Sequence, residues 1–264
     1  MTNGGEGTPN GRPTESALVA AQNATFGIPP SVRAILFDAV GTIIWPEPSV
    51  AGAYGAIGRR HGVELSEAEI SPRFRAALSR QDELDRTHHL GRTSQSREIE
   101  RWRGIVADVF QQAPCAERIF DDLWQHFAQP EHWRLFDDVA MTWRKLSDAG
   151  YLLGVASNFD DRLDQICQAL PPLTRCRHRF VSSRIGWRKP TLDFFAAIAA
   201  QFDLAPEQML LVGDDLENDY LAARAAGWHA VLVDRKAHAL STETLTGEAP
   251  TVATIATLKS LTVL

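Results

Sequence analysis

Short apolar segments that each end at a polar or turn residue recur along this chain of 264 residues. A nearly continuous apolar run of this length is typical of a strand that is buried on both faces of a parallel sheet. The four segments are 32–37, 151–156, 209–212 and 230–233, followed respectively by Asp38, Ser157, Gly213 and Asp234. This repetition predicts a parallel sheet as the core of an α/β fold.

Amphipathic stretches separate the predicted strands, among them 138–149 and 192–202. Alternation of strands and helices favours an open, Rossmann-like sheet with right-handed crossovers. In such sheets the ligand site lies beyond the carboxyl ends of the strands. We therefore expect the polar residues that follow the strands to gather at one edge of the sheet.

Residues 48–133 lack strand-like runs and show helical periodicity with many Arg, Glu and Gln residues. A segment of this length is too long for a simple loop. The pattern predicts a helical domain, 48–133, inserted into a core domain made of residues 31–47 and 134–264. Residues 1–30, rich in Gly, Asn, Thr and Pro, are predicted to be a flexible tail.

Composition narrows the class of protein. The formal net charge of −6 argues against non-specific nucleic-acid binding, which needs a surplus of cations. No apolar run approaches the roughly 20 residues of a membrane span, and the stretch 17–21 is shorter than a signal-peptide core. Cys115, Cys167 and Cys176 form no CxxC pair and are expected to be incidental thiols. The sequence predicts a cytoplasmic protein without nucleic-acid or membrane partners.

Four short motifs follow one another in a characteristic order. They are FDAVGT (37–42), ASN (156–158), RKP (188–190) and GDDLEND (213–219). Their order, and the position of three of them at strand ends, resembles the haloacid dehalogenase superfamily of hydrolases. The flanking residues 131–134 and 154–160 are most similar to its haloacid dehalogenase-like hydrolase domain-containing 3 group. The resemblance extends over roughly residues 31–260 and implies an α/β core with a helical cap.

The first and last motifs carry the predicted nucleophile and metal site. Asp38 directly follows a buried strand, where a carboxylate can act as a covalent nucleophile. In the family, Mg²⁺ binds this carboxylate, the backbone carbonyl two residues later and an acid of the last motif. The resemblance therefore implies Mg²⁺ ligands at Asp38, Val40 (through its carbonyl) and Asp214, with Asp215 as a further contributor.

A phosphoryl group beside Asp38 needs hydrogen-bond donors and a cation. A glycine lets the backbone approach an oxyanion closely, and a threonine hydroxyl can donate to it. Fixed donors and cations are also what stabilises a transferring phosphoryl group. The residues predicted to contact that group are Gly41, Thr42, Ser157, Asn158 and Lys189. The resemblance further implies that Asp219 positions Lys189 or a metal-bound water.

Several of these residues also have an explanation that needs no ligand. Lys189, which precedes Pro190, can be a solvated residue at the start of a helix. Asp38 can start a turn, and Ser157 with Asn158 can cap the following helix. Asp214 and Asp215 can serve as caps, because carboxylates are favoured at a helix N-terminus.

Asp38 and Ser157 are 119 positions apart, whereas Ser157 and Lys189 are only 32 apart. In the family, an insertion after the first motif forms a cap that closes over the active site, so we expect residues 48–133 to set substrate choice. Within it, the aromatic residues Trp102, Phe110, Trp124 and Phe127 are expected to form a helical core. The polar residues expected to be solvated are Asp82, Glu83, Asp85, His88 and His89.

Position 40 departs from the family pattern. Phosphatases of the family usually carry Asp here, which protonates the leaving group, whereas Val40 transfers no proton. Side-chain proton transfer typically contributes about 10²–10⁴-fold. Its loss affects alkyl phosphates most and acyl or aryl phosphates least, because the latter leaving groups have a low pKa. Within the insertion, His88 and His89 are the candidates for a replacement acid.

Other family members also lack this acid. Haloacid dehalogenases usually have Tyr at this position and lack the metal-binding last motif. Phosphonoacetaldehyde-type enzymes use a lysine of the cap, but residues 48–133 contain no lysine.

Three functions follow from this pattern. The first is a Mg²⁺-dependent phosphatase, a monomer or homodimer, that acts on a small phosphorylated metabolite through an aspartyl-phosphate intermediate. The second is a phosphate-binding or regulatory protein with weak turnover. The third is a halide-displacing hydrolase similar to 2-haloacid dehalogenases.

Overall fold

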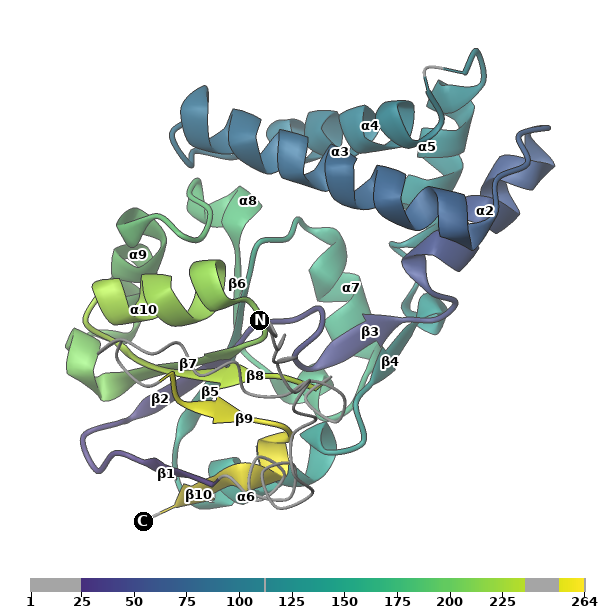
Figure 1. Cartoon of the computed structure of the whole chain (residues 1–264). Helices are drawn as coiled ribbons and strands as arrows, with labels where there is room; N and C mark the ends of the chain where they lie inside the picture. Colours follow the sequence, from purple (N-terminus) through teal and green to yellow (C-terminus); the bar gives the residue numbers. More distant parts are fainter. Residues whose placement is uncertain (1–24, 112, 236–251, 264) are drawn as a thin grey trace, which may run out of the picture.

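The computed structural model describes residues 25–111, 113–235 and 252–263. Its centre is a six-stranded parallel sheet with the order β6-β5-β2-β7-β8-β9 (Figure 1). The strands are β2 (Ala34–Phe37), β5 (Leu152–Ser157), β6 (His178–Val181), β7 (Met209–Gly213), β8 (His229–Val233) and β9 (Thr254–Ile255). The predicted α/β fold class is confirmed, and all four predicted strands exist with bounds shifted by one or two residues.

Side chains of the central strands are buried on both faces of the sheet. Ile35 and Phe37 of β2 pack into one hydrophobic cluster together with residues of α6 and α7. Ala34 and Leu36 pack into the opposite cluster with residues of α9 and α10. These helices are α6 (Val139–Asp148), α7 (Arg162–Ala169), α9 (Leu192–Phe202) and α10 (Ala222–Ala225). Because helices cover both faces of the sheet, the strands have continuous apolar sequences rather than sequences in which apolar and polar residues alternate.

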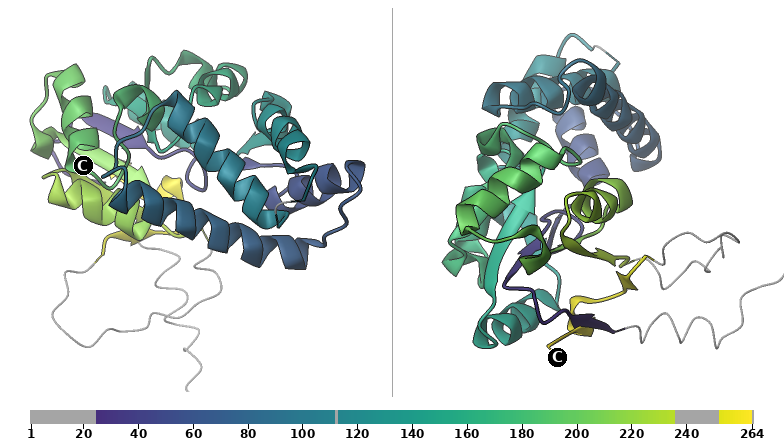
Figure 2. Two further views of the ribbon diagram at one scale, coloured as in Figure 1. Left: turned by 90° about the horizontal axis from the view of Figure 1, so that it is seen from above. Right: turned by 90° about the vertical axis from the view of Figure 1, so that its left-hand side faces the viewer.

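Residues 48–133 contain four longer helices with a hydrophobic cluster of their own. They are α2 (Val50–Arg60), α3 (Glu67–Thr87), α4 (Gln95–Val109) and α5 (Ala116–His126). The aromatic residues Trp102, Phe110, Trp124 and Phe127 belong to this cluster or pack against it, as predicted. The four helices gather on one side of the sheet, with α3 and α4 side by side (Figures 1 and 2). None of the described helices has both the length and the apolar character that crossing a bilayer requires.

Two antiparallel strands connect these helices to the core. β3 (Ile44–Pro46) leads out of the sheet domain and β4 (Trp133–Leu135) leads back, and Trp45 lies opposite Arg134 in their register. Both connections therefore run side by side at one end of the helical unit (Figure 1).

The predicted tail contains a strand. Residues 1–24 lie outside the described residues, but Phe26–Ile28 forms β1, which pairs in parallel with β10 (Leu261–Val263). Ile28 is fully buried in the core. The expectation of a flexible segment up to residue 30 is wrong at this strand, because its partner lies at the far end of the chain and leaves no local pattern. The edge strand β6 was also not predicted, because half of its residues are only partly buried.

Gly154 marks a close approach between strands of the sheet. A Cβ atom at this position would lie 2.6 Å from Leu36 Cδ2 and 2.8 Å from the His178 carbonyl oxygen. We expect Gly154→Ala to lower the free energy of unfolding by about 1–3 kcal/mol, which is typical of an overpacked core. Denaturant unfolding measures this loss. Leu152→Val at the exposed start of the same strand is the control, and an equal effect of both variants would contradict the steric explanation.

His126 lies in a partly buried position at the connection between α5 and β4, where its pKa predicts a pH-dependent stability. Its ring stacks on His132 with centroids 3.6 Å apart, and its buried Nε2 has no hydrogen-bond partner among the described residues. Burial, followed by the charges of His132 and Arg60, lowers the pKa of His126 from 6.5 to about 4. A lowered pKa in the folded state means that protonation favours unfolding, so this contribution is complete above about pH 6.5 and decreases toward pH 4.

We therefore expect the melting temperature to fall between pH 7 and pH 5, and to fall less in His126→Gln. Thermal unfolding at several pH values measures both, with the exposed His88→Gln as control. An identical pH dependence in His126→Gln and the unmodified protein would show that His126 is not responsible.

Candidate active site

The carboxyl ends of the neighbouring strands β5, β2 and β7 lie side by side at one edge of the sheet. Asp38 follows β2, Ser157 ends β5, and Asp214 follows β7. Lys189 joins them from the loop between α8 (Ser182–Ile185) and α9. Asp219 comes from the π-helical turn Leu216–Leu221, which follows β7. The predicted gathering of polar residues beyond the strands is therefore present.

The Lys189 ammonium group lies at the centre of this site. Its Nζ donates hydrogen bonds to Asp219 Oδ1 at 2.5 Å, to Asp38 Oδ1 at 2.7 Å and to the Ala156 carbonyl at 3.1 Å. The residue is only 3% exposed. Burial disfavours its charged form, but the carboxylates of Asp219 and Asp38 more than offset this and raise the pKa of Lys189. Lys189 is therefore a permanent cation at this site.

Three carboxylates lie close to one another at this site, and two of them bind Lys189. Asp38, Asp214 and Asp219 each offer an oxygen atom, and these atoms lie within 4.8 Å of one another. Burial and the charge of Asp38 raise the pKa of Asp214 to about 6, although Asp214 still reaches solvent. Burial likewise raises the pKa of Asp219. The negative charge of the cluster exceeds its positive charge, so a further cation would stabilise it.

Thr42 binds the carboxylate of Asp214, and Gly41 leaves space for it. The Thr42 hydroxyl donates to Asp214 Oδ1 at 3.0 Å. Gly41 has φ +93°, and a Cβ atom there would lie 2.2 Å from Asp214 Oδ2. Both residues were predicted to contact a phosphoryl group. In the structure they contact the carboxylate of Asp214.

Asn158 and Ser157 differ in how their side chains are used. The amide of Asn158 donates to the Lys189 carbonyl at 2.9 Å and accepts from the Lys189 N–H at 2.8 Å. Asn158 therefore clamps the backbone of Lys189, although it was predicted to bind phosphate. The Ser157 hydroxyl makes no hydrogen bond with any residue that the structure describes, and it remains a free donor beside Asp38.

Asp215 does not join the carboxylate cluster. Its Oδ1 accepts from the N–H groups of Glu217 and Asn218, both at 2.9 Å, and its Oδ2 accepts from Asn218 Nδ2 at 2.8 Å. These are the contacts of a residue that caps a helical turn. The structure therefore places Asp215, predicted as a possible metal ligand, in its alternative role as a cap.

Position 40, where phosphatases of the family usually carry the second Asp, holds an apolar and exposed side chain. The side chain of Val40 is 37% exposed. The two histidines considered as replacements lie at the end of α3, both exposed, and His88 Nδ1 lies 2.9 Å from the Thr87 hydroxyl. Among the described contacts neither histidine touches Asp38 or Lys189.

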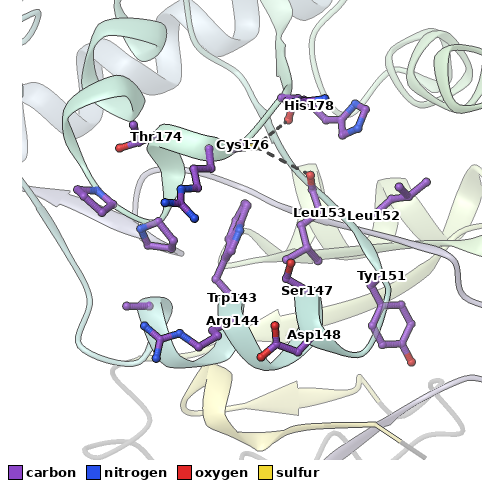
Figure 3. Close-up of a pocket in the computed structure, with 15 residues that line it drawn as sticks. Trp143, Arg144, Ser147, Asp148, Tyr151, Leu152, Leu153, Thr174, Cys176 and His178 are labelled. Carbon is purple, nitrogen blue, oxygen red and sulfur yellow. Dashed lines mark hydrogen bonds between the residues drawn. The ribbon is translucent and has the colours of Figure 1, made fainter.

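A large recess exists elsewhere on the molecule. It has a volume of about 910 Å³ and is lined by residues of α6, by the start of β5 and by the segment before β6 (Figure 3). Trp143 and Arg144 lie on one side of it, and Thr174, Cys176 and His178 on another. It contains none of the predicted site residues, and it lies at the amino end of β5, opposite the end that carries Ser157.

The parallel sheet and the carboxylate–lysine cluster beyond its strand ends define an α/β protein with its candidate active site at the carboxyl edge of the sheet. The chain belongs to the haloacid dehalogenase-like hydrolase family, whose sequence profile matches residues 32–227. Haloacid dehalogenase-like hydrolase domain-containing protein 3 of Danio rerio is 28% identical over 210 residues, which cover 78% of this chain and 86% of that protein. The human protein of the same name is 28% identical over 207 residues, which cover 76% and 82%.

Solved structures with the same fold include two kinds of hydrolase. A defluorinating L-2-haloacid dehalogenase has a TM-score of 0.69 at 19% identity and covers 90% of this chain and 97% of its own. A HAD phosphatase from Thermococcus onnurineus has a TM-score of 0.56 at 21% identity and covers 86% and 95%. At this identity the likeness concerns the fold alone, so the chemistry has to be inferred from the site.

Gly41 gives a direct test of the packing around Asp214. In Gly41→Ala the left-handed backbone costs about 1–2 kcal/mol, and the new methyl group displaces the carboxylate of Asp214. Gly62→Ala is a matched control, because Gly62 has φ +79° and open space around its Cβ position. We expect Gly41→Ala to lower the free energy of unfolding more than Gly62→Ala does. Equal losses would show that Asp214 accommodates the methyl group.

Proposed function

We propose that this chain is a Mg²⁺-dependent phosphatase-type hydrolase that transfers a phosphoryl group from a small metabolite to Asp38. The observation that carries the proposal is the cluster of three carboxylates, two of which pair with the buried Lys189. Such a set of oxygen atoms suits a divalent cation, and the charge of the cation together with that of Lys189 would balance the charge of a phosphoryl group.

The donor atoms of the site fit Mg²⁺. This ion prefers oxygen ligands and usually binds one or two carboxylates together with water and substrate. Asp38 and Asp214 would hold it, with the Val40 carbonyl as a third protein ligand. Asp219 is engaged by Lys189, and Thr42 orients Asp214. When bound, the ion would neutralise charge on the phosphoryl oxygens and orient the substrate.

Asp38 is oriented for nucleophilic attack. Lys189 binds its Oδ1, which fixes the carboxylate and leaves the second oxygen for the phosphorus atom. In the first step a bond from Asp38 to phosphorus forms, and the bond from phosphorus to the leaving oxygen breaks. Water then attacks the phosphorus of the aspartyl phosphate, and the bond from phosphorus to the Asp38 oxygen breaks. Inorganic phosphate leaves, the Asp38 carboxylate is regenerated, and the proton of the attacking water passes to solvent because Val40 offers no base. The free hydroxyl of Ser157 donates to a phosphoryl oxygen in both steps.

Val40 restricts the leaving group. The side chain at this position carries no proton, so the leaving oxygen departs without help from it. Substrates whose leaving group has a low pKa, such as acyl and aryl phosphates, tolerate this absence. The proposed substrate is therefore a small phosphate of this kind rather than a simple alkyl phosphate.

We expect phosphate release from acetyl phosphate and p-nitrophenyl phosphate in the presence of Mg²⁺, and loss of this release with EDTA. Glycerol 3-phosphate should react roughly 10²-fold more slowly, since its leaving group needs protonation. Asp38→Asn should abolish turnover without unfolding the protein. Asp148→Asn is the matched control and should retain full activity. Asp148 is the exposed last residue of α6, which precedes β5 and lies away from the end of β5 that carries Ser157.

Other outcomes of the same panel would replace the proposal. Mg²⁺-dependent binding of a phosphate mimic without any turnover would indicate a phosphate-binding protein. Chloride release from 2-chloropropionate that survives chelation would indicate a halide-displacing hydrolase. Full activity of Asp38→Asn would refute Asp38 as the nucleophile.

A further inference from the structure

Several charged side chains are buried where α3 and α4 meet the loop before Lys189. Asp85 was expected to be solvated, but it is only 4% exposed, unlike Asp82 and Glu83, which are exposed. Glu98 of α4 is 1% exposed, and Arg188 of the core loop is 7% exposed. Charged groups are rarely buried to this degree unless they are paired.

These charges form one connected network. Asp85 accepts from Arg97 Nε at 2.8 Å and from Arg101 at 2.6 Å, and Arg101 also binds Asp82 at 2.6 Å. On the core side, Arg188 forms an ion pair with Glu98, and its Nε lies 3.6 Å from Asp85 Oδ2. We call this set the charge latch: Asp82, Asp85, Arg97, Glu98, Arg101 and Arg188. Its three guanidinium groups are balanced by three carboxylates.

Backbone contacts join the same two segments. The Thr93 N–H donates to the Gly186 carbonyl at 3.0 Å, and the Arg188 N–H donates to the Gly91 carbonyl at 2.9 Å. The Arg92 guanidinium lies 4.3 Å from the ring centre of Trp187. The loop between α3 and α4 is therefore bound to the core both by side chains and by backbone hydrogen bonds. In Figure 1 this end of α3 and α4 lies above α8, far from the β3–β4 connection.

We propose that the charge latch holds this end of the helical unit against the core and that Glu98 is a positioning residue for Lys189. Breaking one partner of a buried ion pair leaves an uncompensated charge, so lifting α3 and α4 from the core is strongly disfavoured. The helical unit is then fixed at two ends, covalently at β3–β4 and by the latch at the α3–α4 loop.

The positioning role follows from the position of Arg188 in the chain. Asn158 holds the backbone of Lys189 on one side, and Arg188, its direct neighbour, is held by Glu98 on the other. The Lys189 ammonium must lie within hydrogen-bond distance of Asp38 and Asp219 at once. A displacement of about 1 Å in such a site can reduce turnover on the order of 10²-fold. This part of the inference rests on the proposed function.

Glu98→Gln is the test, because it keeps the size of the side chain and removes its charge. Hydrogen exchange followed by mass spectrometry should show faster exchange in peptides that cover 88–94 and 184–190. With acetyl phosphate and Mg²⁺, kcat should fall by about 10–100-fold, while KM changes by less than about two-fold. The effect on kcat rather than KM distinguishes misplacement of Lys189 from a general loss of substrate binding.

Two control variants distinguish loss of the charge latch from a general loss of stability and from the removal of any one negative charge. Leu123→Ala removes buried methyl groups from the core of the helical unit and leaves the latch intact. Glu117→Gln removes an exposed carboxylate that pairs with Arg103. Neither variant should change exchange in 88–94 and 184–190, and neither should change kcat. If Glu98→Gln does not fold, Asp82→Asn gives a milder test, because Asp82 is the exposed partner of Arg101.

The outcomes keep the two proposals apart. Unchanged exchange of both segments in Glu98→Gln would refute the latch, whether or not the protein is a phosphatase. Faster exchange together with a kcat equal to that of the controls would refute the positioning role of Glu98. Absence of turnover in the unmodified protein would refute the proposed function, and the exchange measurement would still decide the latch.

Discussion

The charge balance around the Lys189 ammonium group is the constraint on which the rest of this site depends. A buried ammonium is stable only when it is paired, and the two carboxylates it binds would repel each other without it. The ends of β2 and β5 and the π-helical turn after β7 supply the three acceptors around this nitrogen. Displacing Asp38 or Asp219 would leave a charge without its partner in the interior.

Several residues of the four motifs bind other residues of the site in this structure. Thr42 binds Asp214, and Gly41 leaves space for that carboxylate. Asn158 binds the backbone of Lys189, and Asp215 caps the turn that carries Asp219. In a buried loop, donors and acceptors bind fixed partners nearby, because an unsatisfied polar group there is costly. Among the described side chains predicted to contact a phosphoryl group, the Ser157 hydroxyl is the one that makes no hydrogen bond to the protein, which makes it the simplest donor for a bound phosphoryl oxygen.

Buried, paired charges also occur where the helical unit meets the core. The helical unit has an apolar interior that resembles an ordinary helical core, but its contact with the loop before Lys189 is a network of buried charges. Apolar side chains tolerate small shifts, whereas separating a buried ion pair leaves an uncompensated charge. The Arg188–Glu98 pair, which lies next to Lys189 in the chain, is a contact of the second kind.

The sequence by itself determined the sheet and the place of the site. Apolar runs that end at polar residues reveal buried parallel strands, because burial on both faces leaves a strong local pattern, and the carboxyl ends of such strands converge. The tertiary structure alone decided the pairing of β1 with β10, the contacts of Thr42 and the burial of Asp85. Glu98 and Arg188 are ninety positions apart, and neither has a neighbour in the sequence that reveals its partner. Charges are usually solvated, so only the packing of α3 and α4 onto the core shows that these are not.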